Sequence, residues 1–134
     1  MRFVVPAVLI LVAVIHALPV LGMLGAAKLS QLYGITVQDP NLELLLRHRA
    51  VLFGLLAALL AYAAIRPELQ RLALVIGSVS VASFLVLAQL SSSYNDALAT
   101  VVRADWLALA LLLIAAVAHA ATATAALSVE RPVR

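Results

Sequence analysis

The chain has 134 residues, of which 66% are hydrophobic and 11% charged, with a net charge of +3 and no cysteine. A soluble domain of this size carries about a quarter charged residues and could not bury so much apolar surface, so these values exclude a soluble protein and require lipid as the solvent. The lack of cysteine excludes disulfides, thiolate metal sites and cysteine nucleophiles. The charges lie between apolar segments and form no basic patch with interleaved aromatic residues, so we expect no nucleic-acid partner.

The first uncharged stretch covers residues 3–24 and is long enough to cross about 30 Å of hydrocarbon. A cleavable signal peptide is the alternative, because small residues at positions 25–27 precede Lys28. The apolar stretch is longer than the usual core of such a peptide, so we predict a retained membrane span.

Two residues are expected to shape this first helix. Pro19 removes a backbone donor and should bend the helix close to His16. Beyond the membrane the helix is expected to continue as far as Tyr33, where Gly34 is a plausible C-terminal stop.

A helical hairpin is predicted next. Asp39 reads as an N-cap followed by proline at the first helical position, and this helix is expected to end at Ile65 with residues 46–65 in the bilayer. The following polar segment is short, so the third span, residues 72–90, must run antiparallel to the second.

The last span is predicted over residues 106–127, after a polar loop at residues 91–96. Residues 97–104 either form a short helix at the membrane interface or extend this last span. Asp105 is expected to be the N-cap of the span, with Trp106 in the aromatic belt at the membrane surface.

The four stretches predict an all-α fold, a four-helix transmembrane bundle with up-down-up-down topology, in a single integral membrane domain covering residues 1–134. An even number of spans places both termini on one side. Counting Arg47 and Arg49 as embedded leaves five Lys and Arg residues on the side of the termini against two on the other. The positive-inside rule then predicts that both termini are cytoplasmic.

Three consecutive basic residues, Arg47, His48 and Arg49, stand where the second span enters the membrane. Arg47 is in helical register with Glu43 and with a stripe of small residues that is expected to pack against other helices. It is therefore either an interfacial arginine tied to Glu43 or an anchor for an anionic ligand or an internal carboxylate. Because successive residues are about 100° apart around a helix, the three cannot share a face. Arg49 is expected to anchor in lipid headgroups, and His48 is undecided.

His16 and His119 lie inside apolar spans, where ionisable side chains usually face the bundle interior. Their depths differ by roughly 7 Å and no carboxylate or thiolate accompanies them, so we expect no metal site. Each is either a neutral histidine bonded to a hydroxyl or, near Pro19, to the freed carbonyl, or a proton relay or ligand contact. Asp105 could also pair with Arg47 instead of acting only as a cap.

One polar layer on the predicted outer side collects most of the side chains capable of specific bonding. The candidate ligand-binding residues are Arg47, His48, His16, Asp105, Tyr94, Asn95 and Gln89. The sequence has no Walker A loop, G-x-G-x-x-G, H-E-x-x-H or G-x-S-x-G motif, so we predict no enzyme activity, no catalytic residue and no cofactor.

The run of residues 39–54, with Tyr33-Gly34 before it and Arg103-Ala-Asp-Trp106 after it, resembles a group of small bacterial four-span membrane proteins of unknown function. This resemblance covers nearly the whole chain and implies a multi-pass protein of the bacterial inner membrane. Members often carry the automatic name phosphopantetheine adenylyltransferase. That enzyme resembles a soluble nucleotidyltransferase with an H-x-G-H motif, which neither His16 nor His119 matches. In architecture alone the chain is also similar to DoxX-like four-helix membrane proteins.

Two functions of different classes follow. The first is a non-enzymatic accessory or interaction protein that packs in the bilayer against copies of itself or against a larger membrane complex. The alternative is a protein that binds or transports a small anionic or amphiphilic ligand at the outer polar layer, with Arg47 as the anchor and His16 below it.

Overall fold

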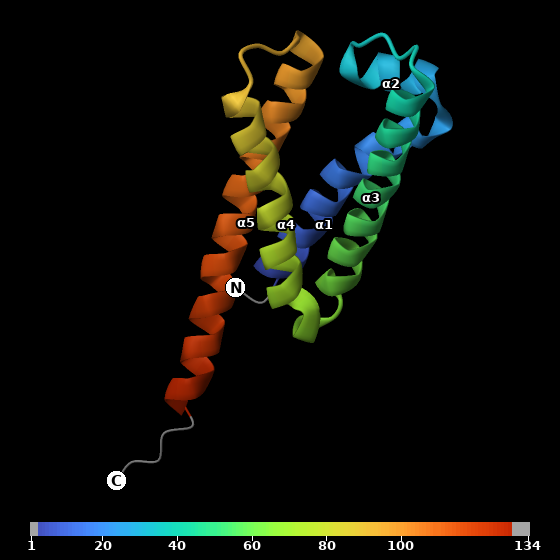
Figure 1. Cartoon of the computed structure of the whole chain (residues 1–134). Helices are drawn as coiled ribbons and strands as arrows, with labels where there is room; N and C mark the ends of the chain where they lie inside the picture. Colours follow the sequence, from blue (N-terminus) through green and yellow to red (C-terminus); the bar gives the residue numbers. More distant parts are fainter. Residues whose placement is uncertain (1–2, 130–134) are drawn as a thin grey trace.

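A computed structural model describes residues 3–129 of the chain, with side chains described up to residue 121. The described part is all-α (Figure 1). In chain order its elements are α1 (Val4–Ala17), the 3-10 helix η1 (Leu18–Leu24), α2 (Ala26–Tyr33), α3 (Pro40–Ala64), α4 (Pro67–Leu90) and α5 (Asp96–Val129).

Four helical stretches are long and apolar enough to cross a membrane, which confirms the expected number of candidate spans and the all-α class. They are Val4–Leu24, Pro40–Ala64, Pro67–Leu90 and Asp96–Ala121. The chain is therefore a multi-pass membrane protein. The direction in which its helices cross the membrane stays a prediction.

The first span does not continue to Tyr33, so that prediction is wrong. The α-helical part ends at Ala17, and Pro19 lies in the 3-10 turn that follows. Gly25 then adopts φ 121°, which only glycine reaches without strain, and the chain turns into the separate helix α2. Figure 1 shows α2 lying across one end of the bundle, which we call the α2 end. Gly34 ends α2 in the left-handed conformation, as predicted.

Helices α3 and α4 form the expected hairpin. The Asp39 carboxylate accepts a hydrogen bond of 2.8 Å from the backbone N–H of Asn41, and Pro40 occupies the first turn, so the predicted N-cap is confirmed. Helix α4 starts at Pro67 instead of the predicted Leu72. Proline followed by Glu68 in the first turn favours this early start, because both suit the free N–H groups of a helix N-terminus.

Helix α5 begins at Asp96, which shows that residues 97–104 extend the last span. Asn95 caps it, since its side-chain Oδ1 accepts a hydrogen bond of 2.9 Å from the N–H of Leu98. The prediction that Asp105 is the N-cap is therefore wrong. Asp105 lies within the helix, roughly 15 Å along the axis from Asn95.

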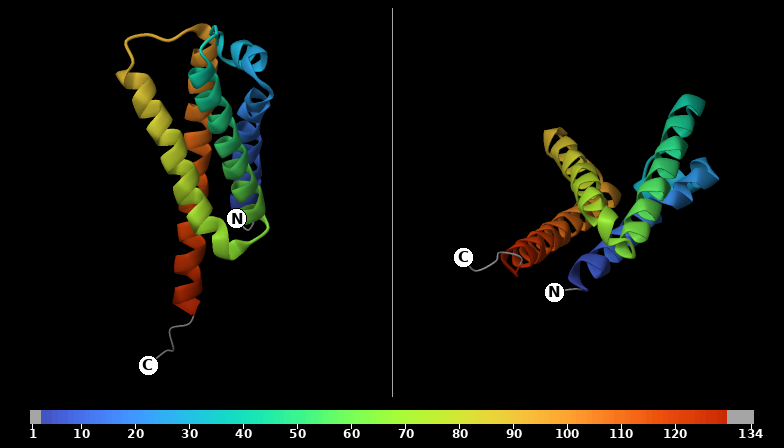
Figure 2. Two further views of the ribbon diagram at one scale, coloured as in Figure 1. Left: turned by 45° about the vertical axis from the view of Figure 1, so that its right-hand side comes forward. Right: turned by 90° about the horizontal axis from the view of Figure 1, so that it is seen from below.

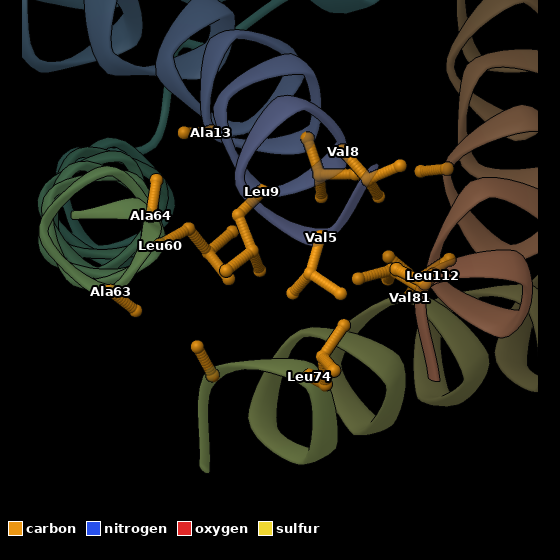
Figure 3. Close-up of a cluster of buried hydrophobic side chains, with 14 of the residues drawn as sticks. Val5, Val8, Leu9, Ala13, Leu60, Ala63, Ala64, Leu74, Val81 and Leu112 are labelled. Atoms are coloured by element: carbon orange, nitrogen blue, oxygen red, sulfur yellow. The ribbon is translucent and has the colours of Figure 1, made fainter. Parts of the chain in front are cut away.

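The main core extends along the bundle from the end opposite α2, where α1 packs against α3, α4 and α5 (Figure 3). Leu9, Leu60 and Leu112 are fully buried there, and Gly77 lets α4 approach, since a Cβ at that position would lie 3.3 Å from Leu60 Cδ2. From this packed end, α3 and α4 diverge towards the α2 end (Figures 1 and 2). A smaller cluster of Leu29, Tyr33 and Val37 fills the α2 end.

Gly34→Ala is expected to lower the free energy of unfolding by about 1 kcal/mol, because φ is 63° at this position and the left-handed conformation is unfavourable for residues with a Cβ. The new Cβ would also lie 3.3 Å from the Cβ of Ala97. Thermal unfolding in a neutral detergent measures the change. Gly34→Asn is the matched control, since it adds the same Cβ but tolerates this conformation better. A Gly34→Ala protein as stable as the wild type would contradict the expectation.

Candidate functional site

Two cavities meet at Arg49 and Phe53 of α3, both on the side of the molecule towards the α2 end. We call the larger one, of about 420 Å³, the groove, and the smaller one, of about 200 Å³, the chamber. The groove falls within the range of about 300–1,000 Å³ that is typical of small-molecule sites.

The groove lies between α3 and α4, where these two helices diverge, and is closed behind by α5. Its lining residues are Arg49, Phe53, Ser80, Ser83, Phe84, Leu87, Ala88, Ser91, Tyr94, Leu98 and Val102. The chamber is lined by the first span, α2, α3 and α5. Its lining residues are Ile15, His16, Leu18, Pro19, Leu32, Tyr33, Arg49, Phe53, Thr100, Val101, Ala104 and Asp105.

Arg49 is the cation shared by both cavities, and it is half-buried. Its guanidinium carbon lies 5.5 Å from the ring centre of Tyr33, 5.0 Å from that of Phe53 and 5.8 Å from that of Phe84. These rings come from α2, α3 and α4, and such contacts are attractive to a cation. The prediction that Arg49 anchors in lipid headgroups is therefore wrong, because its side chain lies between helices.

The guanidinium of Arg49 forms no ion pair with a carboxylate of the described residues. Within residues 3–121 the structure gives it neither an ion pair nor a side-chain hydrogen bond. An arginine presents five N–H donors in a planar fork and is always charged. Its donors are consequently available to a group that enters either cavity.

Arg47 has a different position, outside both cavities. Its Nε donates a hydrogen bond of 3.0 Å to the carbonyl oxygen of Met23, and its Nη1 lies 3.5 Å from Oε1 of Glu43. The ion pair with Glu43 confirms the structural interpretation of this residue. The added bond fastens α3 to the end of η1, where a carbonyl lacks a helical partner. Because Arg47 lines neither cavity, its predicted ligand role stays a prediction.

Two further sequence candidates also lie apart from the cavities around Arg49. His48 is exposed and lines neither the groove nor the chamber. Gln89 is exposed too, and it borders a separate apolar depression together with Trp106 and Leu109. The structure therefore does not bring His48 or Gln89 to the same site as the other predicted residues.

His16 is 4% exposed and lines the chamber. Its Nδ1 bonds the carbonyl oxygen of Val12 at 2.9 Å, instead of the predicted hydroxyl or the carbonyl freed by Pro19. Because a carbonyl oxygen only accepts, Nδ1 carries the proton, and Nε2 is then the acceptor of the ring in its neutral form. The ring also packs against Phe53, with centres 5.8 Å apart and planes tilted by 55°.

Asp105 lines the same chamber from α5 and is half-buried. Its carboxyl group interacts electrostatically with His16 and Arg49, but it forms no ion pair with Arg49 among the described residues. His16 and Asp105, far apart in the sequence, are thus brought together. Within the described residues no group of three or more His, Asp or Glu side chains is arranged to hold a metal ion.

Asn95 and Tyr94 take separate roles at the α2 end. The Asn95 amide donates to the carbonyl oxygens of Tyr33 and Gly34, at 2.9 and 3.2 Å. Since its Oδ1 caps α5, this residue fastens α2 to the start of α5. Tyr94 lines the groove, so of the two only Tyr94 is placed to contact a ligand there.

Tyr33 is a site residue that the sequence did not indicate. It is 6% exposed, its ring faces Arg49, and it lines the chamber. Burial raises the pKa of its phenol, while the charge of Arg49 lowers that pKa by less, so the hydroxyl keeps its proton and can donate. A usable sequence signal exists only for Phe53, which is four residues from Arg49 and so shares its helix face.

No family model, no curated protein and no solved structure matches this chain. The resemblance drawn from residues 39–54 therefore stays a prediction. A function has to be inferred from the geometry of the groove and the chamber.

Proposed function

We propose that this membrane protein binds a small anionic amphiphile at the α2 end. Its acidic group would bind the Arg49 guanidinium and its apolar part would lie in the groove. The observation that supports this most is the unpaired Arg49, which is held among three aromatic rings at the wall shared by two cavities. Arg49 thus takes the anchoring role that the sequence had suggested for Arg47.

An unpaired charge in a half-buried position needs compensation. Removing a charge from water is unfavourable by several kcal/mol unless it gains a partner, so such groups in proteins are paired or reach water. Arginine binds carboxylates and phosphates particularly well, because its planar fork forms two parallel hydrogen bonds with them. Asp105 interacts with Arg49 electrostatically but forms no ion pair with it, and an acidic group in the groove would supply that ion pair.

Hydroxyl groups in the groove can add donors to the same anion. The hydroxyls of Ser83 and Ser91 are occupied, since they donate to the carbonyl oxygens of Ser80 and Leu87 at 2.8 and 3.0 Å. The hydroxyl of Tyr94 has no acceptor among the described residues, and neither does the side chain of Ser80. These two hydroxyls are therefore free to donate to ligand oxygens near Arg49.

The ligand in this proposal comes from the bilayer. Leu87, Leu98 and Val102 give the groove an apolar wall beside the polar groups, which suits a molecule with an acidic head and a hydrocarbon part. The positive-inside count predicts that the α2 end faces outward, and the source would then be the outer leaflet of the inner membrane.

The proposed role is binding without catalysis. No serine of the groove is paired with a base among the described residues: Ser83 and Ser91 donate to backbone carbonyls, and the Ser80 hydroxyl has no hydrogen-bond partner there. The accessory role that the sequence suggested has weaker support. It would rely on the exposed apolar side chains of the spans, and lipid accounts for those equally well.

The test compares three eight-carbon amphiphiles, octanesulfonate, octanol and octyltrimethylammonium, as ligands of the wild-type protein in phosphatidylcholine nanodiscs. Octanesulfonate is expected to raise the unfolding temperature in a saturable way, because only the native site binds it. Octanol and octyltrimethylammonium are not expected to raise the unfolding temperature. Empty nanodiscs correct for partitioning into lipid in a parallel equilibrium measurement. Equal stabilisation by octanol and octanesulfonate would overturn the proposal.

A further inference from the structure

The chamber is lined both by two acceptor groups and by the donor side chain of Arg49. Its polar walls are the Asp105 carboxylate on α5 and the imidazole of His16 on α1. His16 uses its Nδ1–H to bond its own helix, which turns the acceptor Nε2 away from that backbone. Arg49 stands at the border with the groove. The chamber is therefore a site with two acceptors beside a site with a fork of donors.

Arg49 and Asp105 carry opposite charges in one chamber and still do not pair directly. Arg49 is on α3 and Asp105 is on α5, and no ion pair joins them. Both line the same cavity of about 200 Å³. An empty cavity of about 150 Å³ is enough to hold a benzene molecule, so this space fits a short polar chain. A group with a cationic donor could occupy it and satisfy both acceptors.

We infer that the headgroup bound here is a phosphate–ammonium zwitterion with a primary ammonium, as in an ethanolamine phospholipid. The phosphate binds Arg49, the ammonium enters the chamber between Asp105 and His16, and the hydrocarbon lies in the groove. This inference rests on the proposed function and specifies its ligand class.

The chemistry of the acceptors favours a primary over a quaternary ammonium. A primary ammonium has three N–H donors, which can reach a carboxylate oxygen and a histidine nitrogen at the same time. A trimethylammonium group has no such donor and would leave both acceptors without a hydrogen bond. The remaining ionisable group that faces this space is Tyr33 from α2, whose protonated phenol is neutral.

The same arrangement predicts discrimination against ligands that are only anionic. A phosphate without an attached ammonium would bring a second negative charge close to Asp105, and like charges at an interface are unfavourable. Replacing Asp105 by asparagine removes both the attraction to the ammonium and the repulsion of a second anion. The Asp105→Asn variant should therefore lose affinity for the zwitterion and gain affinity for the anion.

The experiment measures binding of three acyl-labelled lysophospholipids in phosphatidylcholine nanodiscs. They carry ethanolamine, glycerol or choline headgroups, and they are tested with the wild type, Asp105→Asn and Asp96→Asn. For the wild type we expect the ethanolamine lipid to bind about tenfold more tightly than the other two. Asp105→Asn should reverse the order of ethanolamine and glycerol lipids. Asp96→Asn, an exposed position on the same helix outside both cavities, should change neither affinity.

The source of the headgroup is tested by competition with free O-phosphoethanolamine. Displacement only at millimolar concentrations supports a lipid ligand, whereas displacement at the concentration of the lysolipid supports the same headgroup chemistry from a soluble source. Gel filtration of each variant checks that it is folded. The headgroup order of the wild type alone decides the inference if Asp105→Asn does not fold.

Several outcomes overturn the inference but leave the proposed function standing. A wild-type protein that binds the glycerol lipid as well as the ethanolamine lipid has no zwitterion preference. Equal binding of the choline lipid would exclude the need for a primary ammonium. Equal losses for ethanolamine and glycerol lipids in Asp105→Asn would show a structural role of the carboxylate. Failure of every lysolipid and of octanesulfonate to bind would overturn the proposed function itself.

Discussion

Arg49→Gln is expected to weaken the binding of octanesulfonate by about 30-fold or more, because a hydrogen bond to a charged group is worth about 2 kcal/mol. Arg47→Gln is expected to change that affinity by no more than about twofold, the small effect expected of an exposed charge. The two arginines stand two positions apart on the same helix, so they are a matched pair. Only one of them lines the cavities.

The physical difference between the two variants lies in what each side chain contacts. Glutamine at position 49 keeps a polar group but loses the charge and the attraction to the rings of Tyr33, Phe53 and Phe84. Glutamine at position 47 gives up the ion pair with Glu43 and the bond to the carbonyl of Met23, neither of which faces the groove. The affinity of Arg49→Lys for octanesulfonate should lie between those of the wild type and Arg49→Gln, since lysine keeps the charge without the planar fork.

Binding is measured in nanodiscs, with empty nanodiscs as the blank and circular dichroism to confirm that each variant is helical. The anchor would be reassigned if Arg47→Gln lost as much affinity as Arg49→Gln. That result would identify Arg47, the residue favoured by the sequence alone, as a ligand-binding residue. A wild-type affinity in Arg49→Gln would remove the groove from consideration altogether.

The difference between Arg47 and Arg49 shows where the sequence stops being informative. The apolar stretches, the Asp39 cap and the glycine stop at Gly34 depend on local chemistry, and each was predicted correctly. Which side of a helix faces its neighbours depends on how the helices pack. A membrane-spanning helix is apolar on all sides, so it has no polar stripe from which its orientation could be predicted. The side chains of Arg47 and Arg49 leave the helix about 200° apart around its axis, so the side that faces the other helices decides which of them lines the cavities.

The misplaced helix start has a similar origin. Asp105 and Asn95 are both good N-caps, and the charge of Asp105 next to Trp106 suggests a membrane boundary. The helix begins at the earlier cap, because helical hydrogen bonds need only a satisfied N-terminus and no lipid. Asp105 is thereby moved into the chamber. The chamber itself was not predictable, since it depends on the turn at Gly25 that brings Tyr33 over Arg49.

Asn95→Ala is expected to lower the free energy of unfolding by about 2–3 kcal/mol. Its side chain forms three hydrogen bonds, to the carbonyl oxygens of Tyr33 and Gly34 and from the N–H of Leu98. Losing an N-cap costs about 1 kcal/mol, and two carbonyls of a helix end also lose their donor. Asn41→Ala is the control, because the Asn41 side chain bonds only the neighbouring Asp39 carboxylate in an exposed position. Equilibrium unfolding in mixed micelles measures both variants.

The position of this bond links stability to the site. Tyr33 is held at its carbonyl by Asn95, while its ring forms one side of the aromatic surround of Arg49. Loosening α2 should therefore reduce octanesulfonate affinity by a few-fold as well, an effect that Asn41→Ala should not share. Equal stability of Asn95→Ala and Asn41→Ala would show that α2 is held by its apolar cluster, Leu29, Tyr33 and Val37, without help from this amide. A loss of stability with unchanged ligand affinity would show instead that the ring of Tyr33 keeps its place when its backbone anchor is gone.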